Sequence, residues 1–348
     1  MAQPMGFGYQ GTETREVFVS QFAAVGLGNA IMDALVQIPD ASILDRIGVA
    51  KGQMTPVDHE QWMVVHDAVK EHGVSTASGG SCANTIVGMG LLGANVSYAG
   101  RVGSDELGRA YLESLKAACN GDAVQVSESM ATGKCLSLIT ADADRTMLTD
   151  LGASVTMADL EGFDAHIRES KVLHVTAYLL LGEPMASRCM EAIAIANQAE
   201  IHVSIDLADP FVVNAKRDEL KHILTEFATI AFLNADEAHA LLGCDPKTAA
   251  SMLGEDVDHV VVKDGARGSY VHHGGVLHTI GVHRTEAVDT TGAGDAYAAG
   301  YLYGLTQGWG PAKSGELASR VASLTVGQVG AVCRDASALE AAVAAVRG

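Results

Sequence analysis

The sequence predicts an α/β fold, in which helices cover both faces of a mainly parallel sheet and a small β-structure lies beside it. Short apolar runs alternate with amphipathic helical segments along most of the chain, and this order is typical of a parallel sheet. Residues 134–150 break the order, because two β-like runs flank turn residues at 141–144 with no helix between them. We therefore expect this hairpin to lie off the main sheet, joined by the extended stretch 30–39.

The first half of the chain follows this plan. A short apolar run at 22–28 predicts a buried strand, and the apolar stretch that starts at Ile31 predicts a second extended piece. A helix is expected from Thr55, which suits the N-cap, with Pro56 at its first position and Gly73 at its end. Next come a helix over 81–93, a strand over 95–103 and a helix over 105–119.

The second half continues the alternation. Strands are expected over 172–177, 202–209 and 229–234, with two more around a turn over 258–273 and a helix over 184–199. Three Ala-rich amphipathic helices close the chain, over about 292–305, 311–327 and 336–346. Residues 1–16 are polar and Gly-rich, so we expect them to form a loose, flexible arm before a single domain over 17–348.

Composition disfavours several classes of function. The chain has 348 residues, of which 48% are apolar, so it can bury a sizeable core. Its formal charge of −19 argues against broad binding of nucleic acid or of an anionic membrane. Six cysteines occur without a C-x-x-C pair, which favours reduced thiols, and the N-terminus lacks a basic region followed by an apolar stretch. We expect a soluble, cytoplasmic protein that binds neither nucleic acid nor membranes.

The most unusual stretch is Gly292-Ala293-Gly294-Asp295, at the expected start of a helix. Small residues let backbone N–H groups converge, and the helix dipole adds partial positive charge. The stretch is therefore suited to bind a phosphoryl group while it is transferred. Asp295 is placed to take the proton of an attacking hydroxyl. A tightly packed helix N-terminus with a dipole-stabilising acid explains the stretch equally well. The chain lacks a G-x-x-x-x-G-K-[ST] motif, and "GLGNAIMD" lacks the third glycine of a dinucleotide fingerprint, which argues against a P-loop enzyme and a dehydrogenase.

Two long motifs resemble one family. "DTTGAGDAYAAGYL" (289–302) matches the C-terminal signature of the ribokinase/PfkB-type carbohydrate kinases, and "GGSCANTIVGMGLLGANVSYAGRVGSDELG" (79–108) resembles their N-terminal signature. The resemblance runs from about Phe22 to the C-terminus and is closest to adenosine kinase-like members. It implies an ATP- and Mg²⁺-dependent kinase with a Rossmann-like three-layer α/β/α core, plus a β-lid formed by about 30–40 and 132–150. A non-catalytic ligand sensor on this fold is a remote alternative, because both the acid and the glycine loop are intact.

The resemblance also assigns roles to individual residues. Asp295 matches the catalytic base, and the anion hole matches Gly292, Ala293 and Gly294. Substrate-binding positions match Asn29, Asp33, Gly79, Gly80 and Asn84, and a lid arginine that clamps phosphate matches Arg145. Taken alone, Asp33 also fits an exposed acid at a strand end, and Arg145 a solvated hairpin arginine.

The nucleotide side is assigned in the same way. Asn234 and Glu237 match a motif associated with placing Mg²⁺ and phosphate, with Glu237 acting partly through water. The nucleotide-binding turn matches Lys263, Gly265 and Gly268. A monovalent cation, K⁺, is held in many members at the positions of Asp289 and Thr291, with carbonyls near 328–330. Taken alone, Asn-x-x-Glu is explained most of the time by a helix cap, and an ordinary strand turn explains the glycines equally well.

The resemblance leaves the alcohol substrate open. Asn29 stands where ribokinase-like members usually carry a second Asp, which favours adenosine or a related nucleoside. A base needs an apolar slot, for which Leu136 and Leu138 with Met54 or Tyr178 are candidates, although the leucines equally suit the core of the lid. Aromatic residues are scarce on the lid, which keeps a free sugar (ribose, fructose or 2-keto-3-deoxygluconate) as the alternative. The expected partners are ATP and this small molecule, in a monomer or a homodimer.

Overall fold

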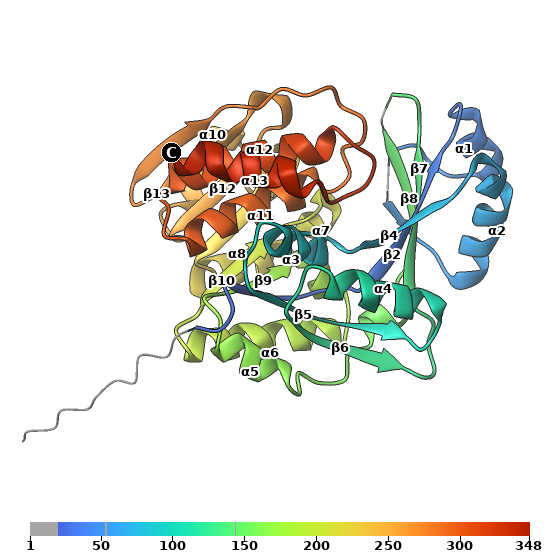
Figure 1. Cartoon of the computed structure of the whole chain (residues 1–348), viewed down its shortest axis with the longest axis horizontal. Helices are drawn as coiled ribbons and strands as arrows, with labels where there is room; N and C mark the ends of the chain where they lie inside the picture. The colour runs from blue at the N-terminus through green and yellow to red at the C-terminus, as the bar shows by residue number, and fades with distance from the viewer. Residues whose placement is uncertain (1–19, 53, 143) are drawn as a thin grey trace, which may run out of the picture.

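Two β-sheets of unequal size organise the chain (Figure 1). The computed structural model describes residues 20–52, 54–142 and 144–348. Within these residues, nine strands form the large sheet in the order β14-β13-β12-β11-β10-β9-β1-β5-β6, and five form the small sheet in the order β3-β8-β7-β2-β4. No helix in this part of the chain is long and apolar enough to cross a bilayer. The arm expected at 1–16 lies outside the described residues.

The large sheet is parallel except at one edge. Its parallel strands are β1 (Ala24–Leu27), β5 (Val96–Gly103), β6 (Gly121–Ser127), β9 (Val172–Thr176), β10 (His202–Asp206), β11 (Ile230–Asn234) and β12 (His259–Lys263). β13 (Ser269–His273) and β14 (Val276–Ile280) extend it as antiparallel strands. Because the carboxyl ends of parallel strands share one edge of a sheet, the last residues of β10, β11 and β12 lie near one another.

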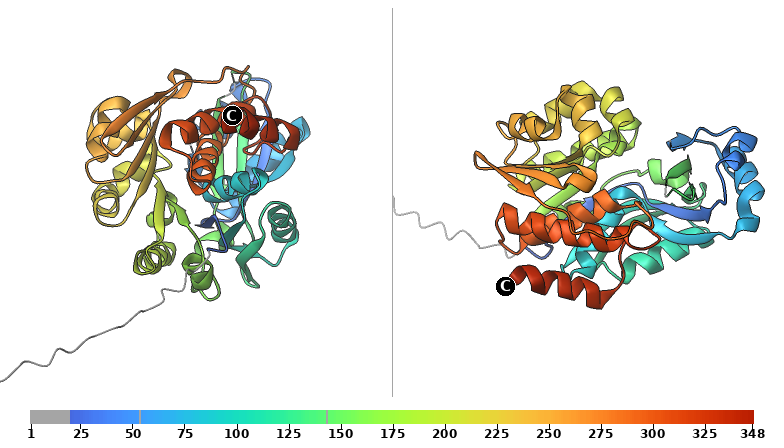
Figure 2. Two further views of the ribbon diagram at one scale, coloured as in Figure 1. Left: turned by 60° about the vertical axis from the view of Figure 1, so that its left-hand side comes forward. Right: turned by 90° about the horizontal axis from the view of Figure 1, so that it is seen from above.

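Helices cover both faces of the large sheet, so the predicted three-layer architecture is confirmed (Figures 1 and 2). One face carries α5 (Phe163–Arg168), α6 (Met185–Gln198), α7 (Pro210–Ala215), α8 (Arg217–Glu226), α9 (Ala235–Leu242) and α10 (Pro246–Leu253). The other carries α3 (Ser81–Leu91), α4 (Glu106–Lys116), α11 (Ala293–Thr306), α12 (Pro311–Val326) and α13 (Ala336–Arg347). A Cβ at Gly88 of α3 would lie 2.8 Å from the Cβ of Ala299 of α11, so the glycine permits these helices to pack closely.

The small sheet lies beside this core, as predicted. It consists of β2 (Ile31–Gln37), β3 (Met54–Pro56), β4 (Ser75–Gly79), β7 (Gly133–Ile139) and β8 (Arg145–Asp150). β7 and β8 form the expected hairpin, and β2 pairs with β7. Helices α1 (Ser42–Ile47) and α2 (His59–Val69) cover its outer face, which is turned away from the large sheet (Figure 1).

Two expectations about this region are wrong. The helix after Thr55 begins only at His59, because the Asp58 side chain accepts a hydrogen bond from Gln61 N in a capping box, and Thr55 lies in β3. Leu136 and Leu138 are fully buried in the core under α1 and α2, so they do not line a slot for a base. Successive strand residues alternate between faces. Ala34 pairs with Leu136, and both face the core under α1 and α2, so Asp33, one position before Ala34, lies on the inner face.

Candidate active site

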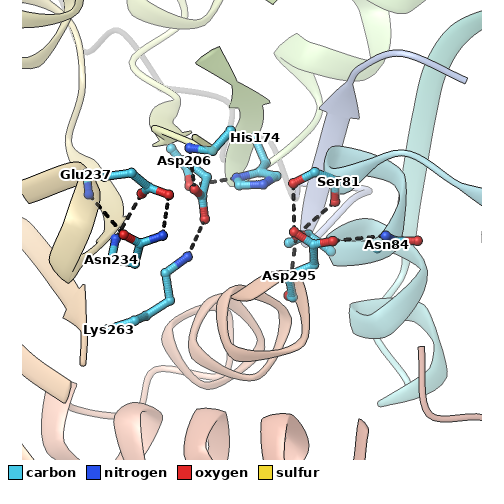
Figure 3. Close-up of polar contacts among 11 residues, drawn as sticks. Ser81, Asn84, His174, Asp206, Asn234, Glu237, Lys263 and Asp295 are labelled. Carbon is cyan, nitrogen blue, oxygen red and sulfur yellow. Dashed lines mark hydrogen bonds and ion pairs between the residues drawn. The ribbon is translucent and has the colours of Figure 1, made fainter. Parts of the chain in front are cut away.

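Asp295 lies where the N-termini of two helices meet (Figure 3). It sits in the first turn of α11, and its carboxylate accepts hydrogen bonds from two side chains of α3, Ser81 Oγ at 2.7 Å and Asn84 Nδ2 at 2.9 Å. Thr85 Oγ1 donates to the Asp295 carbonyl at 3.3 Å. The structure therefore brings together Asn84 and Asp295, which the sequence assigned to substrate binding and to proton transfer.

Opposing effects set the basicity of Asp295. Burial raises the pKa of its carboxyl, the hydrogen bonds from Ser81 and Asn84 lower it, and the Asp206 carboxylate raises it again. The net result is a pKa above the ordinary value, so the carboxylate is a stronger base than an exposed aspartate. A general base that works near neutral pH needs a shift in this direction.

The residues before Asp295 are small because other groups approach the backbone there. Gly292 has a left-handed conformation (φ 69°), and a Cβ at this position would overlap the Ala331 backbone. At Gly294, a Cβ would lie 3.1 Å from Lys263 Nζ. The stretch Gly292-Ala293-Gly294 thus leaves the N-terminus of α11 open and places an ammonium beside it, which suits an anion.

Asp33 reaches the site from the inner face of the small sheet. Its carboxylate packs on Gly79, where a Cβ would overlap the Asp33 oxygens, and Gly80 (φ 95°) leaves room for the Asn29 carbonyl in the same way. Burial raises the pKa of Asp33 to about 7; the charge of Arg145 opposes this rise and that of Asp295 adds to it. Asp33 and Gly79 are therefore in contact, as are Asn29 and Gly80, and the charge of Arg145 acts on Asp33; their roles in substrate binding stay predictions.

A second polar group spans the carboxyl ends of β10, β11 and β12 (Figure 3). Lys263 Nζ, at the end of β12, donates to Asp206 Oδ2, at the end of β10, at 2.8 Å. Asn234 caps α9, and the two oxygens of Glu237 accept hydrogen bonds from Asn234 N and Nδ2 in a capping box. Burial raises the pKa of Glu237, Asp206 adds to the rise, and Lys263 opposes it.

The remaining predicted residues occupy two turns. After Lys263, Gly265 (φ 54°) and Gly268 (φ 100°) have the positive φ that the sequence predicts, and a Cβ at Gly268 would overlap the Ile280 carbonyl. Asp289 is fully buried, and its carboxylate accepts hydrogen bonds from Thr291 N at 2.8 Å and from Gly330 N at 2.9 Å. Both oxygens of Asp289 thus already have protein donors, and K⁺ binding stays a prediction.

Three polar residues of the site were not found from the sequence. Ser81 directly follows the paired glycines at the start of α3, and that position was its only signal. Asp206 ends a buried strand, as Asn234 and Lys263 do, and this shared position could have revealed it. His174 is fully buried in β9 with its Nδ1 2.9 Å from Ser204 Oγ; burial lowers its pKa to about 4 and keeps the ring neutral.

Glu237, near the Lys263 ammonium, fits a nucleotide-borne Mg²⁺. The charges of Asp206, Glu237 and Asp295 all favour the protonated Lys263 and raise its pKa, so three carboxylates lie near one ammonium. Burial is the first cause of the raised pKa of Glu237, and the charge of Asp206 adds to it. No group of three His, Cys, Asp or Glu side chains forms a metal cluster in the described part of the chain. Mg²⁺ commonly takes one or two carboxylates and completes its shell with water and phosphate oxygens, so a dedicated cluster is not required.

A raised-pKa carboxylate at an open helix N-terminus, with a lysine beside it and a second small sheet carrying Asp33, defines a phosphotransferase that acts on an alcohol group. The chain belongs to the pfkB family of carbohydrate kinases, whose profile matches residues 51–336. Membership implies ATP, and usually Mg²⁺, as requirements of the reaction.

Several relatives are nucleoside kinases. The solved structure of adenosine kinase from Sinorhizobium meliloti superposes with a TM-score of 0.86 at 29% identity, over 93% of this chain and 99% of that one. The adenosine kinase of Saccharomyces cerevisiae is 26% identical over 249 residues, which cover 69% of this chain and 72% of that protein. The guanosine-inosine kinase of Escherichia coli (strain K12) is 24% identical over 267 residues, which cover 71% of this chain and 59% of that kinase. These likenesses confirm the ribokinase-like fold predicted from the motifs.

Proposed function

We propose that this kinase transfers the γ-phosphoryl group of ATP to a primary hydroxyl of a ribose-like moiety, with adenosine or a related nucleoside as the acceptor. The observation that carries the proposal is the proximity of Asp33 and Asp295: the Asp33 carboxylate packs on Gly79, two residues before Ser81, and Ser81 Oγ donates to Asp295 Oδ1 at 2.7 Å. Asp33 comes from the small sheet and Asp295 from α11. A ribose whose ring hydroxyls bind Asp33, Asn29 and Asn84 therefore has its primary hydroxyl within reach of Asp295.

Each residue then has a separate task. Asp295 takes the proton of the primary hydroxyl while its oxygen attacks the γ-phosphorus of ATP and the bond to the leaving ADP oxygen breaks. The open N-terminus of α11 stabilises the charge on the phosphoryl group, together with Lys263 and, from the small sheet, Arg145. Glu237 would hold Mg²⁺ partly through water, and the bound ion would neutralise phosphate charge. The turn containing Gly265 and Gly268 lies next to Lys263 and would contact the nucleotide.

Two observations favour a nucleoside over a free sugar. The relatives described above are named as adenosine and guanosine-inosine kinases. The inner face of the small sheet also offers apolar surface. Met54 of β3 pairs with Met147 of β8, and the pairing of the strands puts both side chains on the same face as Asp33. Both methionines are partly buried. These methionines replace Leu136 and Leu138 as candidate contacts of a base. Tyr178, in the segment Ala177–Leu181 directly after β9, stays a third candidate.

A free sugar is the second candidate acceptor. Asp33 would bind the hydroxyls of ribose or a ketose as well as those of a nucleoside, and methionines provide no ring on which a base could stack. Ribose, fructose and 2-keto-3-deoxygluconate therefore belong in the same test as the nucleosides.

An ATP-consumption screen decides between these acceptors. The purified protein with Mg²⁺ and ATP is offered adenosine, other nucleosides and the three sugars, and ADP release is measured. We expect a purine nucleoside to give the highest kcat/KM, because only a nucleoside uses both Asp33 and the apolar inner face. Strong turnover of a free sugar with none of any nucleoside would refute the nucleoside assignment.

Replacing Asp295 with asparagine tests the proposed base. Asparagine keeps the shape of the side chain, so we expect an unchanged melting temperature and ATP affinity but a loss of about 10²–10⁴-fold in kcat. Asp236→Asn is a matched control, because Asp236 is an exposed acid in the first turn of α9, and it should turn over like wild type. Normal phosphorylation by Asp295→Asn would show that the base is another group.

A further inference from the structure

Asp206 is a buried carboxylate that the tasks described above do not use. It ends β10 and is 4% exposed. Its two oxygens have different partners: Oδ1 accepts a hydrogen bond from Ala208 N at 2.9 Å, and Oδ2 accepts one from Lys263 Nζ at 2.8 Å. Ala208 has a left-handed φ of 70°, a conformation that alanine seldom adopts, so the turn orients Asp206 against a local backbone preference. The carboxylate is therefore fixed in direction as well as in position.

Burial and a helix dipole both oppose a cation at the position of Lys263. Its Nζ lies beside Gly294 in the first turn of α11, where the helix dipole carries partial positive charge. The Lys263 side chain is 14% exposed, so water screens it little. Glu237, a second buried carboxylate nearby, has both oxygens engaged by Asn234, and Asp295 accepts its side-chain hydrogen bonds from Ser81 and Asn84. Asp206 therefore supplies the compensating charge that keeps the ammonium at this place.

We propose that Asp206 is a positioning residue that holds the Lys263 ammonium at the N-terminus of α11, where it meets the phosphoryl group that is transferred. The inference rests on the proposed function, because it takes ATP as the arriving anion. In the ligand-free protein the ammonium donates a hydrogen bond to Asp206, whose charge compensates it more than those of Glu237 and Asp295 do (Figure 3). A phosphate at the helix N-terminus shares the ammonium with Asp206, so the lysine is already in place when the nucleotide binds.

A purely structural ion pair would behave differently. Removing one partner of a buried pair destabilises the fold, because the other charge is left unpaired, but the folded fraction would keep its turnover and its ATP affinity. A positioning role predicts instead that the two residues act on turnover through one interaction. Their effects on the free energy of activation should then fail to add.

A double-mutant cycle measures this coupling in wild type, Asp206→Asn, Lys263→Met and the double variant. Asparagine keeps the size of Asp206 and the acceptor for Ala208 N, and removes the charge. We expect Lys263→Met to lower kcat by about 10²–10³-fold, the usual loss of one preorganised donor. Asp206→Asn should lose about tenfold or more, and the double variant should be no slower than Lys263→Met. Asp206→Glu should recover part of the loss, and KM for the acceptor should change by less than about threefold.

The matched control is Asp150→Asn, which breaks a pair of comparable burial in the small sheet. Asp150 Oδ2 lies 3.9 Å from Lys134 Nζ, and the two side chains are 14% and 8% exposed. This variant should keep the wild-type kcat. Calorimetric titration with ATP, which needs no acceptor, is run on all six proteins, and both single variants of the Asp206–Lys263 pair should bind ATP less tightly.

The outcomes separate this inference from the proposed function. If wild type binds ATP but phosphorylates none of the acceptors, the proposed function fails, and weaker ATP binding by both single variants still supports the positioning role. Two results would overturn the positioning role of Asp206. One is a double variant whose loss of kcat is the product of the two single losses, and the other is a folded Asp206→Asn with wild-type kcat and ATP affinity. If Asp206→Asn does not fold, Lys263→Met decides: a wild-type kcat would remove the lysine from the chemistry and the role of Asp206 with it.

Discussion

Replacing Ser81 with alanine should raise the pKa of the proposed base while leaving the rest of the site in place. Ser81 Oγ donates to Asp295 Oδ1 at 2.7 Å, and this bond stabilises the carboxylate over the protonated acid. Asn84 Nδ2 still holds Oδ2 at 2.9 Å, so Asp295 keeps one anchor on α3. The substitution therefore changes the basicity of Asp295 more than its position.

The size of the effect follows from the strength of this bond. A hydrogen bond to a charged group contributes about 1.5–3 kcal/mol, and about 1.4 kcal/mol corresponds to one pKa unit. The pKa of Asp295 should therefore rise by about one to two units in Ser81→Ala. A base must be ionised to accept a proton, so activity is lost as the pH falls through its pKa. The acidic limb of the kcat profile should move to higher pH by the same amount.

The assay is ADP release at saturating ATP and acceptor, followed from about pH 5 to about pH 9 so that kcat reports groups of the enzyme–substrate complex. Ser81→Thr keeps a hydroxyl and should keep the wild-type limb. Ser78→Ala removes a nearby serine bond, the 2.8 Å contact of Ser78 Oγ with Ser114 Oγ, and should also leave the limb in place. If Ser81→Ala lowers the maximal kcat but leaves the acidic limb of the kcat–pH profile at the wild-type pH, the serine only positions Asp295. The reasoning on the basicity of Asp295 would then fail.

Two further predictions concern the acceptor side. Gly79→Ala should raise KM for the acceptor but not for ATP, because a Cβ would overlap the Asp33 carboxylate; a strain of about 1–3 kcal/mol corresponds to a rise of roughly 5- to 150-fold. Gly281→Ala, with nothing within 4 Å of the added Cβ, is its control, and equal KM values in both variants would contradict the contact. Burial raises the pKa of Asp33 to about 7, so its carboxylate becomes protonated below that pH and KM for the acceptor should rise as the pH falls through about 7. Asp33→Asn should have a high KM that no longer depends on pH in this range, and an unchanged pH dependence would assign it to another group.

The fold could be predicted from the sequence where a buried element appears as a continuous run of apolar residues. Strands β9 to β12 are buried on both faces and therefore stand out as short apolar runs between helices. β4 and β6 were not anticipated, because both are edge strands with few apolar residues. Their pairing with β2 and β5 fixes them, and that pairing depends on contacts that local periodicity does not contain.

The same contrast applies to the site. The stretch from Gly292 to Asp295 could be recognised because an open helix N-terminus and its acid occur within one short segment. Ser81 meets Asp295 across 214 positions of the chain, and Asp206 meets Lys263 across 57. The first contact exists because α3 packs on α11, and the second because the large sheet places β10 and β12 on either side of β11. Neither arrangement follows from the local sequence.

Several carboxylates lie close together in the site, and their mutual repulsion affects which of them is ionised. Burial is the first cause of the raised pKa of Asp33, Glu237 and Asp295, and neighbouring carboxylates add to each shift. A triphosphate brings further negative charge, so the field that raises these pKa values also disfavours ATP without Mg²⁺. Asp295 differs because α3 gives it two side-chain donors, which favour its ionised form against this field. The packing of α3 on α11 therefore opposes the rise in the pKa of Asp295, in a site where the Asp33 and Glu237 carboxyls are biased toward protonation.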